Sequence, residues 1–191
     1  DFGRGNIHSI VKALLYVGAT VELDENGERI RTAERLVLPG VGAFQEGVAG
    51  LKQRNQWNAL IEHCNAGRPL MGICLGAQLL MSRSFEFGEC PGLNIIPGDV
   101  EEIPPSSERV PDVGWKPICV KNPEIFGNIG FNSIHDGAWF YFVHSFRIAP
   151  AMENCMLASV MHGRNRIAAI VGRENVVGFQ FHPEKSGKTG L

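Results

Sequence analysis

The stretch LMGICLGAQLL, residues 70–80, decides the fold. Four apolar or small residues run into Cys74, and a helical pattern begins directly after it. Gly72 and Gly76 stand two positions before and two positions after the thiol. A sharp turn from a strand into a helix needs small residues there, because the backbone folds closely against itself. The stretch therefore predicts a buried strand, a tight turn that carries a cysteine, and a helix.

The pattern Gly72-x-Cys74-x-Gly76 is the thiol form of the nucleophile elbow. Such an elbow lifts its side chain above the carboxyl end of the sheet, where open α/β sheets bind ligands. The start of a helix also favours a thiolate, since its unpaired N–H groups and dipole stabilise negative charge. A buried cysteine that packs as a small hydrophobic residue fits the same pattern. A second reactive group must therefore decide the role of Cys74.

The stretch VVGFQFHPEKSG, residues 176–187, supplies that group. A strand is expected to run to His182 and to stop at Pro183, which has no N–H for the sheet. Glu184 then projects to the same side as His182 if the segment is extended. A carboxylate can hold one imidazole nitrogen while the other faces a thiol. Together the two stretches predict a catalytic triad of Cys74, His182 and Glu184.

The rest of the chain predicts an α/β fold. Helices are expected over Ile7–Val17, Phe44–Leu51, Trp57–Ala66 and Gly76–Met81, and strands over Ala19–Leu23, Arg35–Gly40 and Pro69–Cys74. This alternation predicts right-handed crossovers and a parallel sheet. After a loop-rich segment, Pro104–Gly114, strands dominate: Trp115–Val120, Ala138–Phe146, Cys155–Met161, Arg166–Gly172 and Val176–Phe181. We expect a central, mainly parallel sheet flanked by helices, with additional antiparallel strands in the C-terminal half.

Composition excludes several classes of function. The 191 residues are 44% hydrophobic and 20% charged, as expected for one soluble globular domain over residues 1–191. A formal charge of −2 gives no footprint for nucleic acid, and no apolar window approaches the ~18 residues that cross a membrane. Five scattered cysteines without a CxxC pair suit reduced thiols in a cytoplasm. We expect no cofactor and no metal, and we interpret four histidines as structural or surface residues: His8, His63, His135 and His162.

Three motifs in this order resemble the class I (triad) glutamine amidotransferases, which have a flavodoxin-like fold: PGVGAF (Pro39–Phe44), GICLGAQLL (Gly72–Leu80) and FQFHPEKSG (Phe179–Gly187). Within that family, DFGRGN (Asp1–Asn6), FYFVHSF (Phe140–Phe146) and the Gly-Trp of VPDVGW are similar to the glutaminase subunits of imidazole glycerol phosphate synthases. Members usually carry a strand before DFG and a helix after the final Gly-Leu. The resemblance therefore implies that the sequence is truncated at both ends.

The resemblance implies a thioester mechanism. Cys74 attacks the side-chain amide of glutamine, His182 protonates the departing ammonia and later activates water, and Glu184 holds the imidazole tautomer. Elbow geometry assigns the first oxyanion donor to the backbone N–H of Leu75. The second donor is expected from Gly40, Val41 and Gly42, a segment that flips its peptide in the family; the segment read alone is an ordinary turn after a strand. We therefore expect weak glutaminase activity in the isolated chain.

The substrate glutamine has expected contacts as well. Gln78 lies one helical turn after Cys74 on the same face, and the resemblance gives it the amino-acid end of the substrate; the alternative is a solvated residue. The resemblance also gives the backbone of His144, Ser145 and Phe146 a role in gripping glutamine. Family members often have tyrosine at the position of Phe146, which matters little if backbone atoms make the contact.

The resemblance implies a heterodimer whose partner is a cyclase subunit with a (β/α)₈-barrel fold. Ammonia would pass through that barrel to make imidazole glycerol phosphate and AICAR in histidine biosynthesis. Four residues match family positions near this junction: Asn6, Trp115, Tyr141 and Lys185. Each also has an ordinary structural alternative: Asn6 as a turn residue, Trp115 and Tyr141 as core aromatic residues, and Lys185 as a solvated charge.

Two departures from the family pattern leave the acceptor of ammonia open. Asp112 and Val113 stand where the family usually has His-Met, and the segment Arg83–Gly92 differs as well. Related subunits supply ammonia to enzymes that amidate cell-surface (lipopolysaccharide) sugars, so such a partner is an alternative. A cysteine peptidase or γ-glutamyl hydrolase is less favoured, because it needs no such oxyanion segment or docking lysine. A regulatory subunit without activity would be expected to have lost one of the triad residues.

Overall fold

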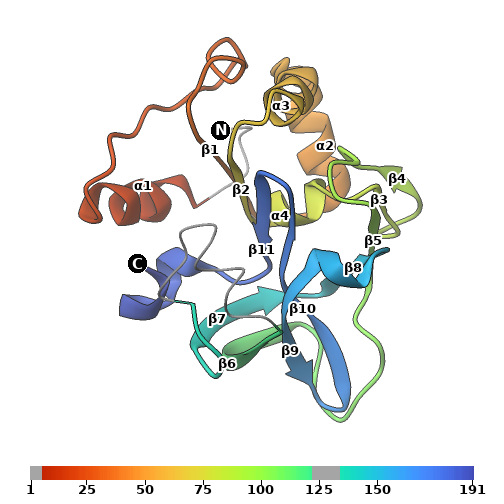
Figure 1. The fold of residues 1–191 in the computed structure, drawn as a ribbon. Helices are drawn as coiled ribbons and strands as arrows, with labels where there is room; N and C mark the ends of the chain where they lie inside the picture. Colours follow the sequence, from red (N-terminus) through yellow and green to blue (C-terminus); the bar gives the residue numbers. More distant parts are fainter. Residues whose placement is uncertain (1–5, 122–133) are drawn as a thin grey trace.

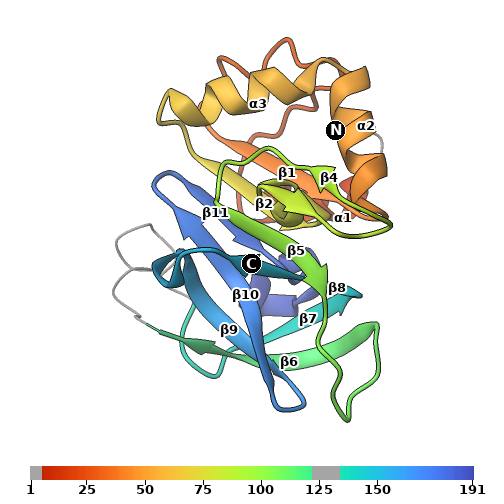
Figure 2. The same cartoon turned by 90° about the vertical axis from the view of Figure 1, so that its right-hand side faces the viewer.

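The computed structural model describes residues 6–121 and 134–191, so the DFGRG part of the first motif lies outside the described residues. Figures 1 and 2 show helices α2 and α3 at one end of the molecule and the β6–β7 hairpin at the other. The helices are α1 (Ile7–Tyr16), α2 (Phe44–Gln53), α3 (Gln56–Asn65) and α4 (Leu75–Leu79), with 3₁₀ helices η1 (Glu153–Cys155), η2 (Pro183–Lys185) and η3 (Gly187–Gly190).

Two sheets carry the strands. The larger sheet has the order β1-β2-β11-β10-β9-β6-β7, and the smaller has the order β4-β3-β5-β8. The strands are β1 (Leu36–Gly40), β2 (Leu70–Cys74), β3 (Arg83–Ser84), β4 (Cys90–Pro91), β5 (Gly98–Glu102), β6 (Asp112–Val120), β7 (Trp139–His144), β8 (Phe146–Pro150), β9 (Met156–His162), β10 (Asn165–Arg173) and β11 (Val176–Phe179).

The expected α/β architecture is confirmed, with antiparallel strands in the C-terminal half. In the larger sheet, parallel pairing joins β1 to β2 and β2 to β11, whereas the other four pairs are antiparallel. The parallel part is thus smaller than the sequence predicts. Two-residue connections link β9 to β10 and β10 to β11, and connections of that length produce hairpins rather than parallel crossovers.

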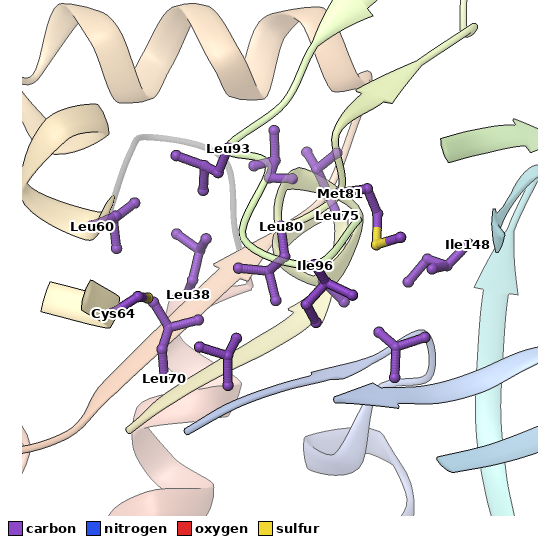
Figure 3. Close-up of a cluster of buried hydrophobic side chains, with 14 of the residues drawn as sticks. Leu38, Leu60, Cys64, Leu70, Leu75, Leu80, Met81, Leu93, Ile96 and Ile148 are labelled. Carbon is purple, nitrogen blue, oxygen red and sulfur yellow. The ribbon is translucent and has the colours of Figure 1, made fainter. Parts of the chain in front are cut away.

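The parallel strands are covered on both faces because their side chains alternate. Leu36, Leu38 and Leu70 belong to the core shared with α2, α3 and α4, part of which Figure 3 shows. Val37 and Ile73 point to the opposite face, where they pack against Ile10 of α1. Among the described residues, no helix is both long and apolar enough to cross a bilayer.

The larger sheet curls, so that its last strand, β7, lies beside the segments that follow β2 and β11. β7 is the edge strand farthest from β1 in the hydrogen-bonded order. Nevertheless, the backbone N–H of His182, which follows β11, donates to the carbonyl of Tyr141 on β7 at 3.0 Å. The curl therefore brings β7 against the carboxyl ends of β2 and β11.

Three details of the strand prediction are wrong. Ala19–Leu23 forms no strand; four of its five side chains are exposed, and no described strand pairs with it. β11 ends at Phe179, three residues before His182. The N–H of Gln180 still donates to the carbonyl of Ala169 on β10, but that of His182 donates to β7. The expected strand Ala138–Phe146 divides at Ser145, where His144 still pairs with β6 and Phe146 already pairs with β5.

We expect Gly76→Ala to destabilise the protein strongly. An added Cβ would lie 1.8 Å from the carbonyl oxygen of Leu38, so α4 and β1 would have to separate. The free energy of unfolding should fall by about 3 kcal/mol or more, measured by urea unfolding followed by circular dichroism. Gly18→Ala is the control, since Gly18 has φ +88° but open space around it; a cost of about 1 kcal/mol is expected. Equal losses would contradict the steric argument.

Candidate active site

Cys74 lies in a strained turn between β2 and α4. Its backbone adopts φ 52° and ψ −110°, a region that side-chain-bearing residues rarely occupy. A Cβ on Gly72 would lie 2.8 Å from the backbone of Ala77, and one on Gly76 would strike the carbonyl of Leu38. Both positions therefore require glycine, because the turn leaves no room for a side chain there. Such strain persists where the surrounding structure fixes it, and it clusters at functional sites.

His182 and Glu184 form a buried pair beside this turn. The Nδ1–H of His182 donates to Oε1 of Glu184 at 2.8 Å, and both side chains are 2% exposed. A carboxylate only accepts, so a proton must sit on Nδ1, and Nε2 is the ring nitrogen that faces away from Glu184. Glu184 reaches the ring through the 3₁₀ helix η2 rather than through an extended segment. The expected contact is thus made by a different local structure.

The ring of His182 interacts with the thiol of Cys74. Burial lowers the pKa of His182, but hydrogen-bond and charge interactions with Cys74 and Glu184 outweigh burial and raise it to about 9. Within the described residues, Nε2 of His182 has no hydrogen bond of good geometry. The structure therefore brings the three predicted residues together and gives Nε2 of His182 no hydrogen-bond partner that would compete with the thiol.

The curled sheet supplies the opposite wall. The carbonyl oxygen of Val143 on β7 lies 3.9 Å from Sγ of Cys74. Nε2 of Gln180, which is fully buried, lies 4.0 Å from the same sulfur. Sequence reasoning missed Gln180. Its position two residues before His182 was the available signal, since alternate residues of an extended segment share a face.

Gln78 points into the site and not into solvent. Its side chain is 6% exposed, and Nε2 donates to the carbonyl of Phe146 and to Oε1 of Gln180, both at 3.2 Å. Nδ1–H of His144 donates to the same carbonyl of Phe146 at 2.8 Å. The alternative of a solvated Gln78 is therefore wrong. Ser145 is exposed between the two strands, and the backbone contacts of this segment with glutamine stay a prediction.

The expected oxyanion donors lie at the same edge of the sheet. Gly40, the last residue of β1, is the register partner of Cys74. Val41 follows with 40% exposure, and Gly42 has φ +101°. Leu75 begins α4 directly after the thiol. Their role as donors stays a prediction.

Three of the four candidate interface residues form one patch. Trp115 and Tyr141 are cross-strand partners on β6 and β7 with an edge-to-face contact at 6.2 Å, and Nζ of Lys185 lies 6.0 Å from the Tyr141 ring. Trp115 is 48% exposed, so it is no core residue. Asn6 precedes α1, where its carbonyl accepts the N–H of Ile10 as a turn residue would.

Comparison with known proteins places the chain in a family. The sequence model of the family described as Glutamine amidotransferase class-I matches residues 1–190. A protein named imidazole glycerol phosphate synthase subunit HisH from Lacticaseibacillus casei is 44% identical over 192 residues, covering 100% of this chain and 89% of its own length. A subunit HisH 1 from Legionella pneumophila is 40% identical over 202 residues, with 100% and 92% coverage.

Solved structures agree in fold. A structure described as a glutamine amidotransferase superposes with a TM-score of 0.75 at 18% identity, covering 98% of this chain and 90% of that chain. PurLQS from Thermotoga maritima gives a TM-score of 0.68 at 19% identity, covering 98% and 91%. From its motifs, its fold and its full-length relatives, this chain belongs to the class I glutamine amidotransferase family.

Proposed function

We propose that this chain is the glutaminase subunit of an imidazole glycerol phosphate synthase, a single cytoplasmic domain over residues 1–191 that hydrolyses glutamine to glutamate and ammonia. The observation that carries the proposal is the thiol of Cys74, held in a strained turn and facing the buried His182–Glu184 pair. The full-length similarity to proteins named subunit HisH supports the same conclusion.

The chemistry follows from the positions of the side chains. The sulfur of Cys74 attacks the side-chain amide carbon of glutamine while His182 holds the proton on Nε2, in keeping with the raised pKa of the ring. The imidazolium then protonates the leaving nitrogen, so ammonia departs and a thioester remains. Neutral His182 next takes a proton from water, whose oxygen attacks the thioester and releases glutamate. Glu184 keeps Nδ1 protonated throughout, which presents Nε2 to each proton transfer.

The tetrahedral intermediates carry a negative oxygen that needs donors. Leu75 offers its backbone N–H because it begins a helix immediately after the nucleophile. Gly40 lies next to Cys74 across the β1–β2 pair, and Val41 and Gly42 follow it directly. Glycine on both sides of Val41 makes reorientation of a peptide sterically easy. Gln78 and the segment His144–Phe146 would bind the amino-acid end of glutamine.

The proposed partner is a (β/α)₈-barrel cyclase subunit in a heterodimer. Ammonia is a useful nucleophile only while it stays unprotonated, so it must pass directly to an acceptor. The exposed patch of Trp115, Tyr141 and Lys185, together with Asn6, is the proposed docking surface. The carbonyl of Tyr141 accepts the N–H of His182, so this surface lies directly behind the catalytic base.

A second acceptor deserves a test because of one observation. Val113, one of the departures from the family pattern, is 54% exposed and lies two residues before Trp115 on β6, so both project from the same face. A changed residue beside the proposed docking surface favours a changed partner. The alternative is an enzyme that amidates a cell-surface sugar.

A glutamine-like diazo ketone should label Cys74 alone. The electrophile reacts with the activated thiol, so peptide mass spectrometry should find one modified residue per chain. Cys119→Ala is the matched control, since Cys119 is an exposed thiol outside the site and its loss should change nothing. Absence of labelling, or labelling that persists in Cys74→Ala, would remove the proposed chemistry.

Replacing Glu184 by glutamine keeps the shape of the side chain and removes its charge. We expect kcat of the complete enzyme to fall by a factor of about 100 to 10,000 with little change in KM. The pKa of His182 should fall below about 9, because Glu184 is one of the groups that raise it. Steady-state kinetics and an NMR titration of the ring measure the two effects. Glu174→Gln, with a side chain 74% exposed, is the control; an unshifted pKa in Glu184→Gln would contradict the assignment.

The isolated chain should be a weak glutaminase. If the second oxyanion donor forms only on docking, the cyclase subunit should raise kcat at least about a hundredfold, the worth of one such donor. Glutamate release with and without the purified cyclase measures this. Full activity of the free chain would contradict the donor model. Activation by a sugar-amidating enzyme and not by the cyclase would favour the alternative acceptor.

A further inference from the structure

A second group of reactive side chains lies apart from the triad, at the end of the β6–β9 region. Asp112 begins β6 and is 3% exposed, and His162 ends β9 and is fully buried. Glu108 reaches the same place from the preceding loop and is 42% exposed in its side chain. The proposed glutaminase chemistry uses none of the three, so their presence needs another explanation.

Unsatisfied polar atoms concentrate at this place. Across residues 6–121 and 134–191, seven buried side-chain nitrogen or oxygen atoms have no hydrogen-bond partner. Four of them lie here: Oδ2 of Asp112, Nε2 of His144 and both ring nitrogens of His162. Two more belong to His182 and Glu184, where a reacting group is expected. Buried polar atoms are normally paired, so such a concentration points to a group that binds between them.

The donor atoms have the spacing of a metal site. Nδ1 of His162 lies 3.4 Å from Oε2 of Glu108 and 3.5 Å from Oδ1 of Asp112. All three donor atoms lie within 4.8 Å of one another. Two ligands on a tetrahedral zinc ion, with bonds near 2.1 Å, are separated by about 3.4 Å. One imidazole and two carboxylates are also ligands that zinc accepts.

The ammonium group of Lys116 lies between the two carboxylates. Its Nζ lies 2.5 Å from Glu108 and 2.6 Å from Asp112, and it also donates to the carbonyl of Met161 at 3.3 Å. Two carboxylates and one ammonium leave one net negative charge beside two imidazole rings. Replacing the ammonium by a divalent ion would bring that sum to zero, which favours the exchange in a buried site. The side chain of Lys116 is 16% exposed, so it has a route to solvent.

We propose that Glu108, Asp112 and His162 form a binding site for a divalent transition-metal ion of the zinc class, and that Lys116 occupies the site when no ion is bound. The bound ion joins the loop before β6 to β6 and β9. His144 faces the second oxygen of Asp112 at 3.7 Å, so it borders the site without completing it.

Metal-stripped protein would be titrated with Zn²⁺ against a chelating dye, and with Co²⁺ for its absorption spectrum. The protein carries Cys74→Ala so that the proposed nucleophile does not bind the ion. We expect one equivalent of Co²⁺ with a tetrahedral spectrum and no thiolate charge-transfer band. His162→Ala and Asp112→Asn should each remove that equivalent.

The decisive variant is Lys116→Met, which removes the competing ammonium and keeps the side-chain length. Zn²⁺ affinity should rise at least about tenfold, because a positive charge a few ångströms away is lost. Lys121→Met is the matched control, since Lys121 pairs with Glu153 and not with the proposed ligands. This variant should bind Zn²⁺ with the same affinity as the parent protein. Unchanged affinity in Lys116→Met would overturn the proposal, as would a site that survives His162→Ala. This comparison also decides the matter if the histidine variant does not fold, and it is independent of glutaminase activity.

Discussion

The contact between Gly76 and the carbonyl of Leu38 is the constraint on which the site depends. It presses the first turn of α4 against β1, and this forces Cys74 into its left-handed backbone conformation. The same turn places Leu75 directly after the sulfur and Gln78 one helical turn farther along. Because β1 and β2 are in parallel register, Gly40 stops beside Cys74. One close approach of two backbones thus positions the nucleophile and the groups expected to serve it.

The other half of the site comes from the curl of the sheet. β7 contributes the carbonyls of Tyr141 and Val143, which face His182 and Cys74. The carbonyl of Phe146 accepts hydrogen bonds from Gln78 and His144, and Gln78 also donates to Gln180. Buried amide and imidazole groups would be costly without such partners, so the network fixes their orientation. The side chains that border the sulfur on the β7 side are therefore held in place by hydrogen bonds.

Sequence patterns predicted correctly those features that depend on neighbouring residues in the chain. The glycines around Cys74 act on their own neighbours, and this pattern was interpreted correctly as a tight turn from a strand into a helix. The end of β11, the division at Ser145 and the missing strand at Ala19–Leu23 were predicted wrongly, because each depends on which strand lies alongside. The Asp112–His162 cluster was missed for a related reason, because its members are far apart in the chain. Gln180 was missed although its position two residues before His182 was a local signal.

β7 contributes both to the outer patch of aromatic residues and to the catalytic site. Tyr141 extends its ring to the outer patch, while its own carbonyl and that of Val143 lie against the base and the nucleophile. The outer ring and the two inner oxygens are carried by one strand, since Tyr141 and Val143 both lie on β7. A displacement of β7 would therefore move the outer ring and the two inner oxygens together.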